Sequence, residues 1–274
     1  MIRPGIRDDL PALRALFGSA NDGPYDLARV AEEKCFGEGI GGAPQLRVIE
    51  NHGAIQAAAV FCGKWLRILV VARDARRTGL GSALLAEAES RGVTIIAAEP
   101  GNYFTPGVVT TDANSRRFLL ERGFAEGPST QNLEVTPGAF DDAETVRRPP
   151  HAEKERVLAF IEREFGRIWQ FEASKAFDRE TPPLFVTEEN DSITGFAAHD
   201  VNNRGLGFFG PTGVAKAMRG RGLGCALLRA SLADLKRLGF TRVVIPWTDA
   251  IAFYDRCSGA EPAHQFVAFA KRRT

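Results

Sequence analysis

The chain has 274 residues, of which 44% are hydrophobic and 25% are charged, and its formal net charge is +1. This composition is typical of globular proteins, and the near-neutral charge gives no sign of a nucleic-acid or anionic-membrane partner. No apolar run approaches the roughly 18 to 20 residues of a membrane span, and the N-terminus has no signal-peptide core, so we expect a cytoplasmic protein.

The first half of the chain alternates between helical and extended patterns. Asp8 and Asp9 precede apolar residues at helical spacing and favour a helix start. Turn signals at 51–53 and 63–64 separate strand-like runs, as in an antiparallel meander. The expected elements are a strand near residue 2, helices over 10–17 and 25–35, strands over 45–50, 54–62 and 65–71, a helix ending at 91, and a buried strand over 93–98.

The second half repeats this order, and its long helix is expected to have about one turn more than its counterpart. The segment 137–150 is charged and bounded by prolines, and predicts a linker between domains 1–136 and 151–274. The expected elements of the second half are helices over 153–165 and 168–177, strands over 184–187, 193–198 and 206–214, a helix ending at 238, and a strand over 241–247.

A fifteen-residue string occurs once in each half. Residues 71–85 read VARDARRTGLGSALL and residues 214–228 read VAKAMRGRGLGCALL, with nine identical positions. The copies begin 143 residues apart, at 71 and 214, so each repeat is a full domain rather than one unit of a solenoid.

Each copy of the string lies between an expected strand and an expected helix. Its glycines let the backbone pass close to a ligand, and the N–H groups of the helix's first turn point outward at the positive end of the helix dipole. Arginines add cationic partners, so the pattern predicts a pyrophosphate site, although it matches neither GxxxxGK[ST] nor GxGxxG. The predicted binding residues are Val71, Arg76, Arg77, Gly79 and Gly81 in the first copy, and Val214, Ala215, Arg219, Gly220, Arg221, Gly222, Leu223 and Gly224 in the second.

The order of elements, together with these two loops, resembles the GCN5-related N-acetyltransferase (GNAT) superfamily in its tandem two-domain form. The resemblance covers nearly the whole chain and implies two α/β domains with mixed (α+β) sheets. It also implies acetyl-CoA as co-substrate, bound where two parallel strands part: 65–71 from 93–98, and 206–214 from 241–247. Backbone N–H groups near Val71 and Val214 would then hold the thioester carbonyl and its developing oxyanion.

A second signature of the family separates the two halves. The resemblance implies a tyrosine, on a helix after the fifth strand, that protonates the departing CoA thiolate. Phe253 and Tyr254 match this signature, although the glycine that follows comes one residue later than in the family. Leu119 occupies the tyrosine position in the first half, and leucine cannot donate a proton. We therefore expect a catalytic C-terminal domain and an impaired or non-catalytic N-terminal one, unless Tyr254 is simply a core tyrosine.

The general base has weaker signals. An amine acceptor is mostly protonated at neutral pH, so a carboxylate, a histidine or an ordered water must take its proton. His199 ends an expected strand and Asp249 follows another, which makes both of them candidates. Each could equally be a turn residue at a strand end.

The cysteines and histidines show no metal-binding pattern. Neither a CxxC motif nor a zinc spacing occurs, so we expect no metal and reduced thiols, as is usual in the cytosol. Cys257 lies three residues from Tyr254 and is expected to be a buried bystander thiol, with a covalent acyl carrier as the alternative. The four cysteines are Cys35, Cys62, Cys225 and Cys257.

A long loop over 99–113 (EPGNYFTPGVVTTDA) precedes the last helix of the first half. Fifteen residues are many for a bare connection, and the loop carries Tyr103 and Phe104. We therefore hypothesise that it builds an acceptor pocket, at the interface between the domains.

These observations favour an acetyl-CoA-dependent N-acetyltransferase that acts on a small primary amine, as a monomer or homodimer. Within the family, the tandem layout, Pro-Gly-Val at 106–108 and the Trp247 that precedes Tyr254 resemble the glucosamine/glucosaminide acetyltransferases. A mycothiol-synthase-like tandem acetyltransferase is an enzyme alternative. A non-catalytic acyl-CoA-binding sensor is another, favoured for the first half by Leu119, whereas the near-neutral charge disfavours an RNA-modifying enzyme.

Overall fold

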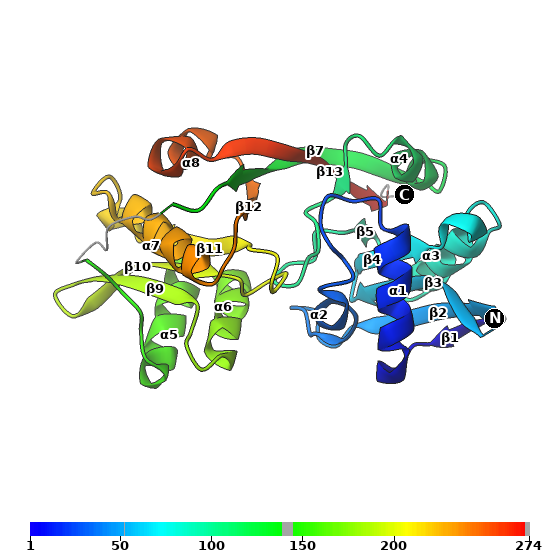
Figure 1. Ribbon diagram of the computed structural model, residues 1–274, viewed down its shortest axis with the longest axis horizontal. Coiled ribbons are helices and arrows are strands. Elements are labelled where there is room, and N and C mark those ends of the chain that lie inside the picture. Colours follow the sequence, from blue (N-terminus) through cyan, green and yellow to red (C-terminus); the bar gives the residue numbers. More distant parts are fainter. Residues whose placement is uncertain (52, 139–144, 272–274) are drawn as a thin grey trace. The chain divides into compact units, whose positions relative to one another are not determined.

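A computed structural model describes residues 1–51, 53–138 and 145–271 of the chain, which form two compact units (Figure 1). Unit 1 comprises Met1–Thr130 and His264–Thr274, and unit 2 comprises Gln131–Ala263. Within the described ranges, no helix combines the length and the apolar character needed to cross a membrane.

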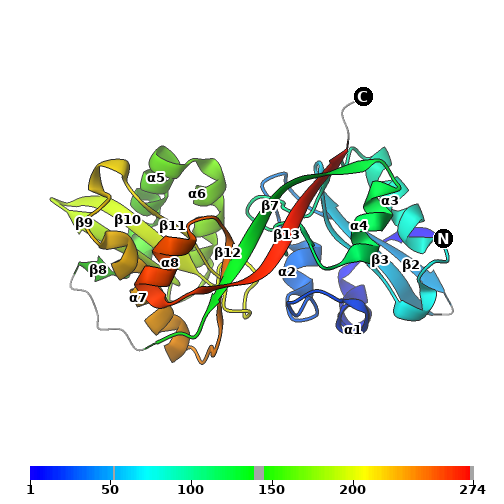
Figure 2. The same cartoon turned by 90° about the horizontal axis from the view of Figure 1, so that it is seen from above.

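Unit 1 is built on a mixed sheet with helices on both faces. Strands β1 to β4 are antiparallel neighbours, β5 is parallel to β4, and helices α1 and α3 cover opposite faces (Figures 1 and 2). The strands are β1 (Ile2–Pro4), β2 (Gln45–Asn51), β3 (Ala54–Cys62), β4 (Trp65–Val71), β5 (Ile95–Ile96) and β6 (Val108–Val109). The helices are α1 (Leu10–Ala20), α2 (Ala31–Phe36), α3 (Leu80–Ser90) and α4 (Ala113–Leu120).

Unit 2 has the same plan. Its strands β8 to β11 form an antiparallel sheet, with α5 and α6 on one face and α7 on the other (Figure 2). The strands are β8 (Val146–Arg147), β9 (Leu184–Glu189), β10 (Ser192–His199), β11 (Phe209–Val214) and β12 (Val243–Thr248). The helices are α5 (Lys154–Phe165), α6 (Arg167–Ser174), α7 (Leu223–Arg237) and α8 (Ile251–Ser258).

The last strand of each half of the sequence contributes to the unit of the other half. Strand β7 (Phe124–Val135) ends in unit 2, where Val135 and Leu133 pair with Val243 and Ile245 of β12. Strand β13 (Glu261–Lys271) ends in unit 1, where Phe269 pairs with Ile96 of β5. The units therefore differ from the sequence-based domains 1–136 and 151–274, because strand pairing is non-local and no local pattern reports it.

The expected linker 137–150 lies partly outside the described residues, which exclude 139–144. Its last part is built into unit 2, because β8 pairs with β9. The guanidinium of Arg147 bonds the carboxylates of Glu153 and Glu188 at 2.6 and 2.7 Å. Strand β8 is therefore an edge strand of the unit 2 sheet.

Most expected elements are present, and the differences have backbone causes. Helices α3 and α7 have 11 and 15 residues, which confirms the expected extra turn. The buried strand expected over 93–98 is reduced to β5, because Ala97 and Ala98 have φ near +55° and cannot continue a strand. Similarly, β11 begins only at Phe209, after Gly207 at φ +73°.

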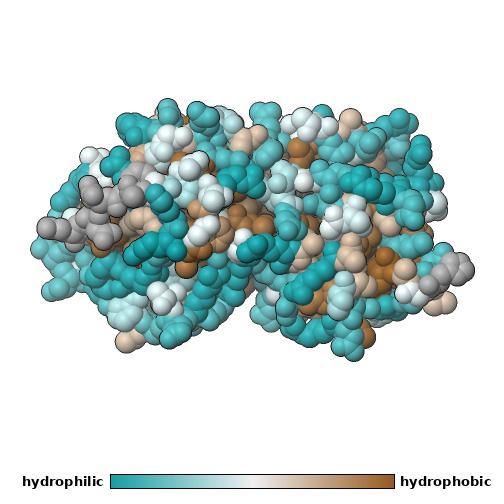
Figure 3. All heavy atoms as spheres, viewed as in Figure 1, coloured by the Kyte–Doolittle hydropathy of each residue, from teal (hydrophilic) through white to brown (hydrophobic). Residues whose placement is uncertain are grey.

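Apolar cores lie on both faces of the unit 2 sheet and against α3 in unit 1. Tyr254 and Cys257 belong to the unit 2 core on the α7 side, and Leu119 belongs to the unit 1 core. Tyr254 and Leu119, the two residues compared at the tyrosine position, are thus both helix residues that point into a core. Hydrophilic residues cover most of the visible face of each unit (Figure 3).

Candidate active site

In each unit two parallel strands pair briefly and then part. Strands β4 and β5 pair at Trp65–Ile95 and Leu66–Ile96. In unit 2 the parallel contact is a single bridge between Phe208 and Val244, whose N–H donates to Gly207 at 2.9 Å. The strand pairs expected to separate therefore do so in both units.

A β-bulge follows the last paired residues on the first strand of each pair. In β4 the extra residue is Arg67, since Val60 faces Ile68 while Phe61 faces Leu66. In β11 the extra residue falls at Gly210–Pro211, between the partners of Ala197 and His199. Counted along the repeat, Arg67 and Gly210 occupy the same position.

The glycine loops (residues 76–81 of unit 1 and 219–224 of unit 2) each end in a helix N-terminus. Gly79 and Gly222 precede the helices with φ of +93° and +81°, a conformation that favours glycine. The first helical bonds run from Ala83 to Gly79 and from Ala226 to Gly222. The N–H groups of 80–82 and of 223–225, Leu223 among them, thus have no helical acceptor and can meet an anion.

The second glycine of each loop packs against an aromatic ring. A Cβ at Gly81 would lie 3.6 Å from the ring of Phe118, and a Cβ at Gly224 would lie 3.2 Å from Phe253 Cζ. The ring of an aromatic residue in the following helix lies next to each of these glycines. The loop is thereby packed directly against α4 or α8.

The loop arginines differ between the units. In unit 1 the guanidinium of Arg76 donates to Asp22 at 2.7 Å and to the Ala20 carbonyl at 2.6 Å. In unit 2 Arg219 is exposed and donates its Nε to the Val214 carbonyl at 3.1 Å, and none of the described residues accepts from its two Nη atoms. Arg219 can therefore reach an anion without giving up an ion pair.

The remaining predicted loop residues are placed as follows. Arg221 forms a two-pronged ion pair with Glu189, at 3.0 and 2.6 Å. The Ala215 N–H donates to Thr194 at 2.8 Å, and the Val71 carbonyl accepts from Arg76 at 3.3 Å. Arg77 and Gly220 have positive φ, of +62° and +80°.

Tyr254 lies where the strands of unit 2 part. Its ring meets that of Phe209, the first residue of β11, edge-on at 6.3 Å, and only 8% of the residue is exposed. Burial raises the pKa of Tyr254 to about 12, so its hydroxyl stays protonated at neutral pH. The corresponding Leu119 of unit 1 is buried among apolar residues.

The two candidate bases lie in different environments. Asp249 is exposed, in the turn between β12 and α8. His199 is fully buried, and its Nε2 is 2.8 Å from Asp234 of α7, with the Phe185 ring stacked on it. Burial lowers the pKa of His199, although Asp234 acts in the opposite direction. His199 is thus held in a buried polar cluster, whereas Asp249 is accessible to a substrate.

A buried ion pair of unit 1 was not anticipated. Arg67 donates to both oxygens of Glu99 at 2.6 and 2.7 Å, and to the carbonyls of Lys34 and Gly37. A Cβ at Gly39 would collide with the Glu99 carboxylate, so this glycine closes over the pair. The sequence signals were an isolated arginine in the apolar strand WLRILVV and a glutamate at the end of an apolar run.

The aromatic residues of the loop over 99–113 are buried. Tyr103 and Phe104 are each 7% exposed, and Phe104 packs edge-on against Tyr25 at 6.4 Å. The loop also contributes β6, which pairs with β13. Its length is explained by packing within unit 1, which does not favour the hypothesis of an acceptor pocket.

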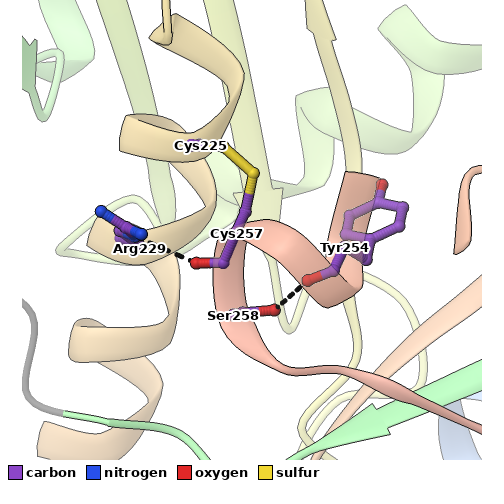
Figure 4. Close-up of a disulfide and its surroundings, with 5 residues drawn as sticks. All are labelled: Cys225, Arg229, Tyr254, Cys257 and Ser258. Carbon is purple, nitrogen blue, oxygen red and sulfur yellow. Dashed lines mark hydrogen bonds between the residues drawn. A yellow bond between two sulfur atoms is a disulfide. The ribbon is translucent and has the colours of Figure 1, made fainter. Parts of the chain in front are cut away.

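The cysteine expectation was wrong for two of the four residues. Cys225 and Cys257 form a disulfide, which connects α7 to α8 (Figure 4), and Cys257 is therefore no bystander thiol. Cys35 and Cys62 are free and buried, and burial raises their pKa to about 12 and about 11. In the described part of the chain, no group of three or more His, Cys, Asp or Glu residues could hold a metal ion.

Comparison with solved structures places this geometry among known folds. A glucosamine N-acetyltransferase region of a fungal multi-domain β-N-acetylglucosaminidase superposes with a TM-score of 0.79 at 18% identity, over 98% of this chain and 38% of that one. A GCN5-related N-acetyltransferase from Sphaerobacter thermophilus gives 0.71 at 19%, over 99% and 95%. A tandem GNAT protein of the clavulanic acid biosynthesis pathway gives 0.70 at 16%, over 98% and 97%.

These likenesses define the class: two mixed α/β units with the tandem GNAT fold. The model of the acetyltransferase (GNAT) family matches residues 151–260, which lie within unit 2. A search among curated proteins found no match.

Proposed function

We propose that the protein is an acetyl-CoA-dependent N-acetyltransferase that transfers acetyl directly to the primary amine of a small molecule, with its chemistry in unit 2. The observation that carries this proposal is Tyr254, a protonated hydroxyl at the point where β11 and β12 part. Support also comes from the family match, which covers this unit.

The loop of unit 2 has the groups that a pyrophosphate requires. The N–H groups of 223–225 have no helical acceptor, and the Arg219 guanidinium is exposed beside them. Acetyl-CoA would supply the thioester at the parting of the strands. A backbone N–H near Val214 would donate to the developing oxyanion there, although the Ala215 N–H already donates to the Thr194 carbonyl.

The proposed reaction needs one proton acceptor and one proton donor. The amine nitrogen attacks the carbonyl carbon, the C–S bond breaks, and the sulfur receives the proton of the Tyr254 hydroxyl. Asp249 takes the proton that the amine loses, because it is exposed and close in sequence to α8. Solvent then reprotonates Tyr254 and takes the proton from Asp249, which returns both residues to their starting states.

For the acceptor we propose an amino sugar, acted on in the cytoplasm by a monomer or homodimer without nucleic-acid, membrane or metal partners. The tandem sequence resemblance supports this choice, as does the likeness to a structure described as a glucosamine N-acetyltransferase region. We propose that unit 1 is non-catalytic, because Leu119 cannot donate a proton and Arg76 is committed to Asp22.

The test combines calorimetric titration of the intact chain with acetyl-CoA and an acetylation assay on an amine panel that includes glucosamine. We expect one strong acetyl-CoA site and transfer to at least one amine. Two sites of equal affinity would contradict the asymmetry. Binding without transfer to any amine would favour the acyl-CoA sensor.

A further inference from the structure

Helices α7 and α8 are joined at three positions along α7. Gly224 packs against the ring of Phe253. Cys225 is disulfide-bonded to Cys257, and Arg229 donates its Nε to the Cys257 carbonyl at 3.0 Å (Figure 4). Cys225 is the third residue of α7, and its N–H is one of the three at the helix N-terminus that have no helical acceptor. The disulfide thus links the glycine-loop helix to the helix that carries Tyr254.

Unit 1 makes the same connection without a covalent bond. Ser82 stands in the repeated string where unit 2 has Cys225, and Arg122 follows Phe118 by four residues, as Cys257 follows Phe253. Arg122 donates to the Ser82 hydroxyl at 2.6 Å. The described residues therefore show a covalent link only for the helix that bears the tyrosine.

We infer that the Cys225–Cys257 disulfide is a redox-dependent positioning element that holds α8 in place, so that Tyr254 reaches the parted strands when the disulfide is formed. This inference rests on the proposed function of unit 2. Helix α8 has eight residues, too few to be stable by itself, so tertiary contacts keep it in place. Displacement of a proton donor by about 1 Å can slow a reaction severely, so release of the link lowers the rate.

The redox step is a thiol–disulfide exchange with a small dithiol. A thiolate of the dithiol attacks one sulfur of the disulfide, which releases one cysteine and forms a mixed disulfide. The second thiol of the same dithiol then attacks this mixed disulfide and releases the other cysteine. The dithiol becomes a cyclic disulfide, and its two protons end on Cys225 and Cys257. Cys225 is the partly exposed partner and Cys257 the buried one, so attack begins at the Cys225 sulfur.

The first experiment compares the intact oxidised protein with protein reduced by dithiothreitol and alkylated. We expect kcat to fall about threefold to tenfold on reduction, with the KM for acetyl-CoA within about twofold. The Cys225→Ser/Cys257→Ser variant should match the reduced protein and no longer respond to dithiothreitol, whereas Cys62→Ala should still respond. An unchanged kcat after verified reduction would overturn the inference.

Two further measurements separate a positioning role from a merely structural one. In Tyr254→Phe the ratio of oxidised to reduced kcat should approach one, because the donor that the disulfide positions is absent; a ratio that persists overturns the inference. Amide hydrogen exchange over 251–258 should accelerate on reduction, and unchanged exchange also overturns it. Because exchange is read without turnover, failure of the disulfide inference is distinguishable from failure of the proposed acetyl transfer.

Discussion

The two units share a glycine loop and differ in what stands opposite it. In unit 1 the bulged residue of β4 is Arg67, which fills the interior with an ion pair to Glu99. In unit 2 the bulge falls at Gly210, which has no side chain, and Tyr254 lies against the start of β11. The loop and its helix are retained in both units, whereas the groups around the parted strands are not.

This difference shows that the glycine loop and the residues at the parted strands are separable parts of one fold. The loop depends on backbone conformation and on the helix N-terminus, which are local and survive in both copies. Proton transfer depends on residues brought to the loop by distant segments. Substitutions in each unit therefore test whether the two units really differ in this way.

The largest effect is expected for Glu99→Gln in unit 1. The variant leaves the buried Arg67 guanidinium without a charged partner, which typically costs about 3 to 5 kcal/mol of unfolding free energy. Denaturant unfolding of the intact chain measures the loss. The matched control is Glu189→Gln, which breaks an exposed pair with Arg221 and should cost less than about 1 kcal/mol. Equal losses of unfolding free energy in the two variants would show that the buried Arg67–Glu99 pair stabilises unit 1 no more than an exposed ion pair does.

Tyr254→Phe should lower kcat about a hundredfold, because it removes the proton donor, while the KM for acetyl-CoA changes little. Tyr103→Phe, in unit 1, serves as the control and should keep full activity. Since burial raises the pKa of Tyr254 to about 12, the wild-type rate should show no tyrosine-dependent fall as the pH rises to 10. Full activity in Tyr254→Phe would remove the main difference between the units.

Arg219→Ala should weaken acetyl-CoA binding about tenfold, the effect of one charge-assisted hydrogen bond. Arg76→Ala should change the affinity of the strong site little, since Arg76 is engaged by Asp22 and Ala20. Titration calorimetry measures both variants. The reverse order of effects would place the strong site in unit 1.

The smallest effect concerns acid stability. Burial lowers the pKa of His199 below its unfolded value of about 6.5, so the unfolded chain binds the proton more strongly. This contribution to stability is present above pH about 6.5 and is lost as the pH falls, by at most about 1.4 kcal/mol per unit. Unfolding of wild type and His199→Gln between pH 7 and 5 tests it. Parallel pH dependences would mean that folding does not lower the pKa of His199.

Much of the scaffold could be predicted from the sequence. Hydrophobic periodicity and glycine punctuation predicted the order of helices and strands, including the longer α7, because these signals are local. The same reasoning made the expected strand over 93–98 too long. Ala97 and Ala98 have positive φ, and nothing in the apolar run indicates this backbone conformation. This reasoning also gave no sign that Phe118 and Phe253 pack against the second loop glycines.

The candidate site could be predicted only in part. The contrast between Tyr254 and Leu119 was visible in the repeat. A sequence pattern does not show how deeply a side chain is buried, however, so His199 and Asp249 looked alike as strand-end residues. The structure buries the first beside Asp234 and exposes the second. The expectation of four reduced cysteines was wrong for Cys225 and Cys257, because 32 residues of separation do not reveal that two helices meet.

The duplication, the two glycine loops and the half that carries the tyrosine can all be read from the amino-acid sequence, since each is a matter of residue identity within a short window. The exchange of β7 and β13, the Arg67–Glu99 pair, the buried state of His199 and the disulfide between α7 and α8 depend on the tertiary structure. These features join residues from about 30 to more than 150 positions apart, and such contacts depend on how whole elements pack rather than on local propensity.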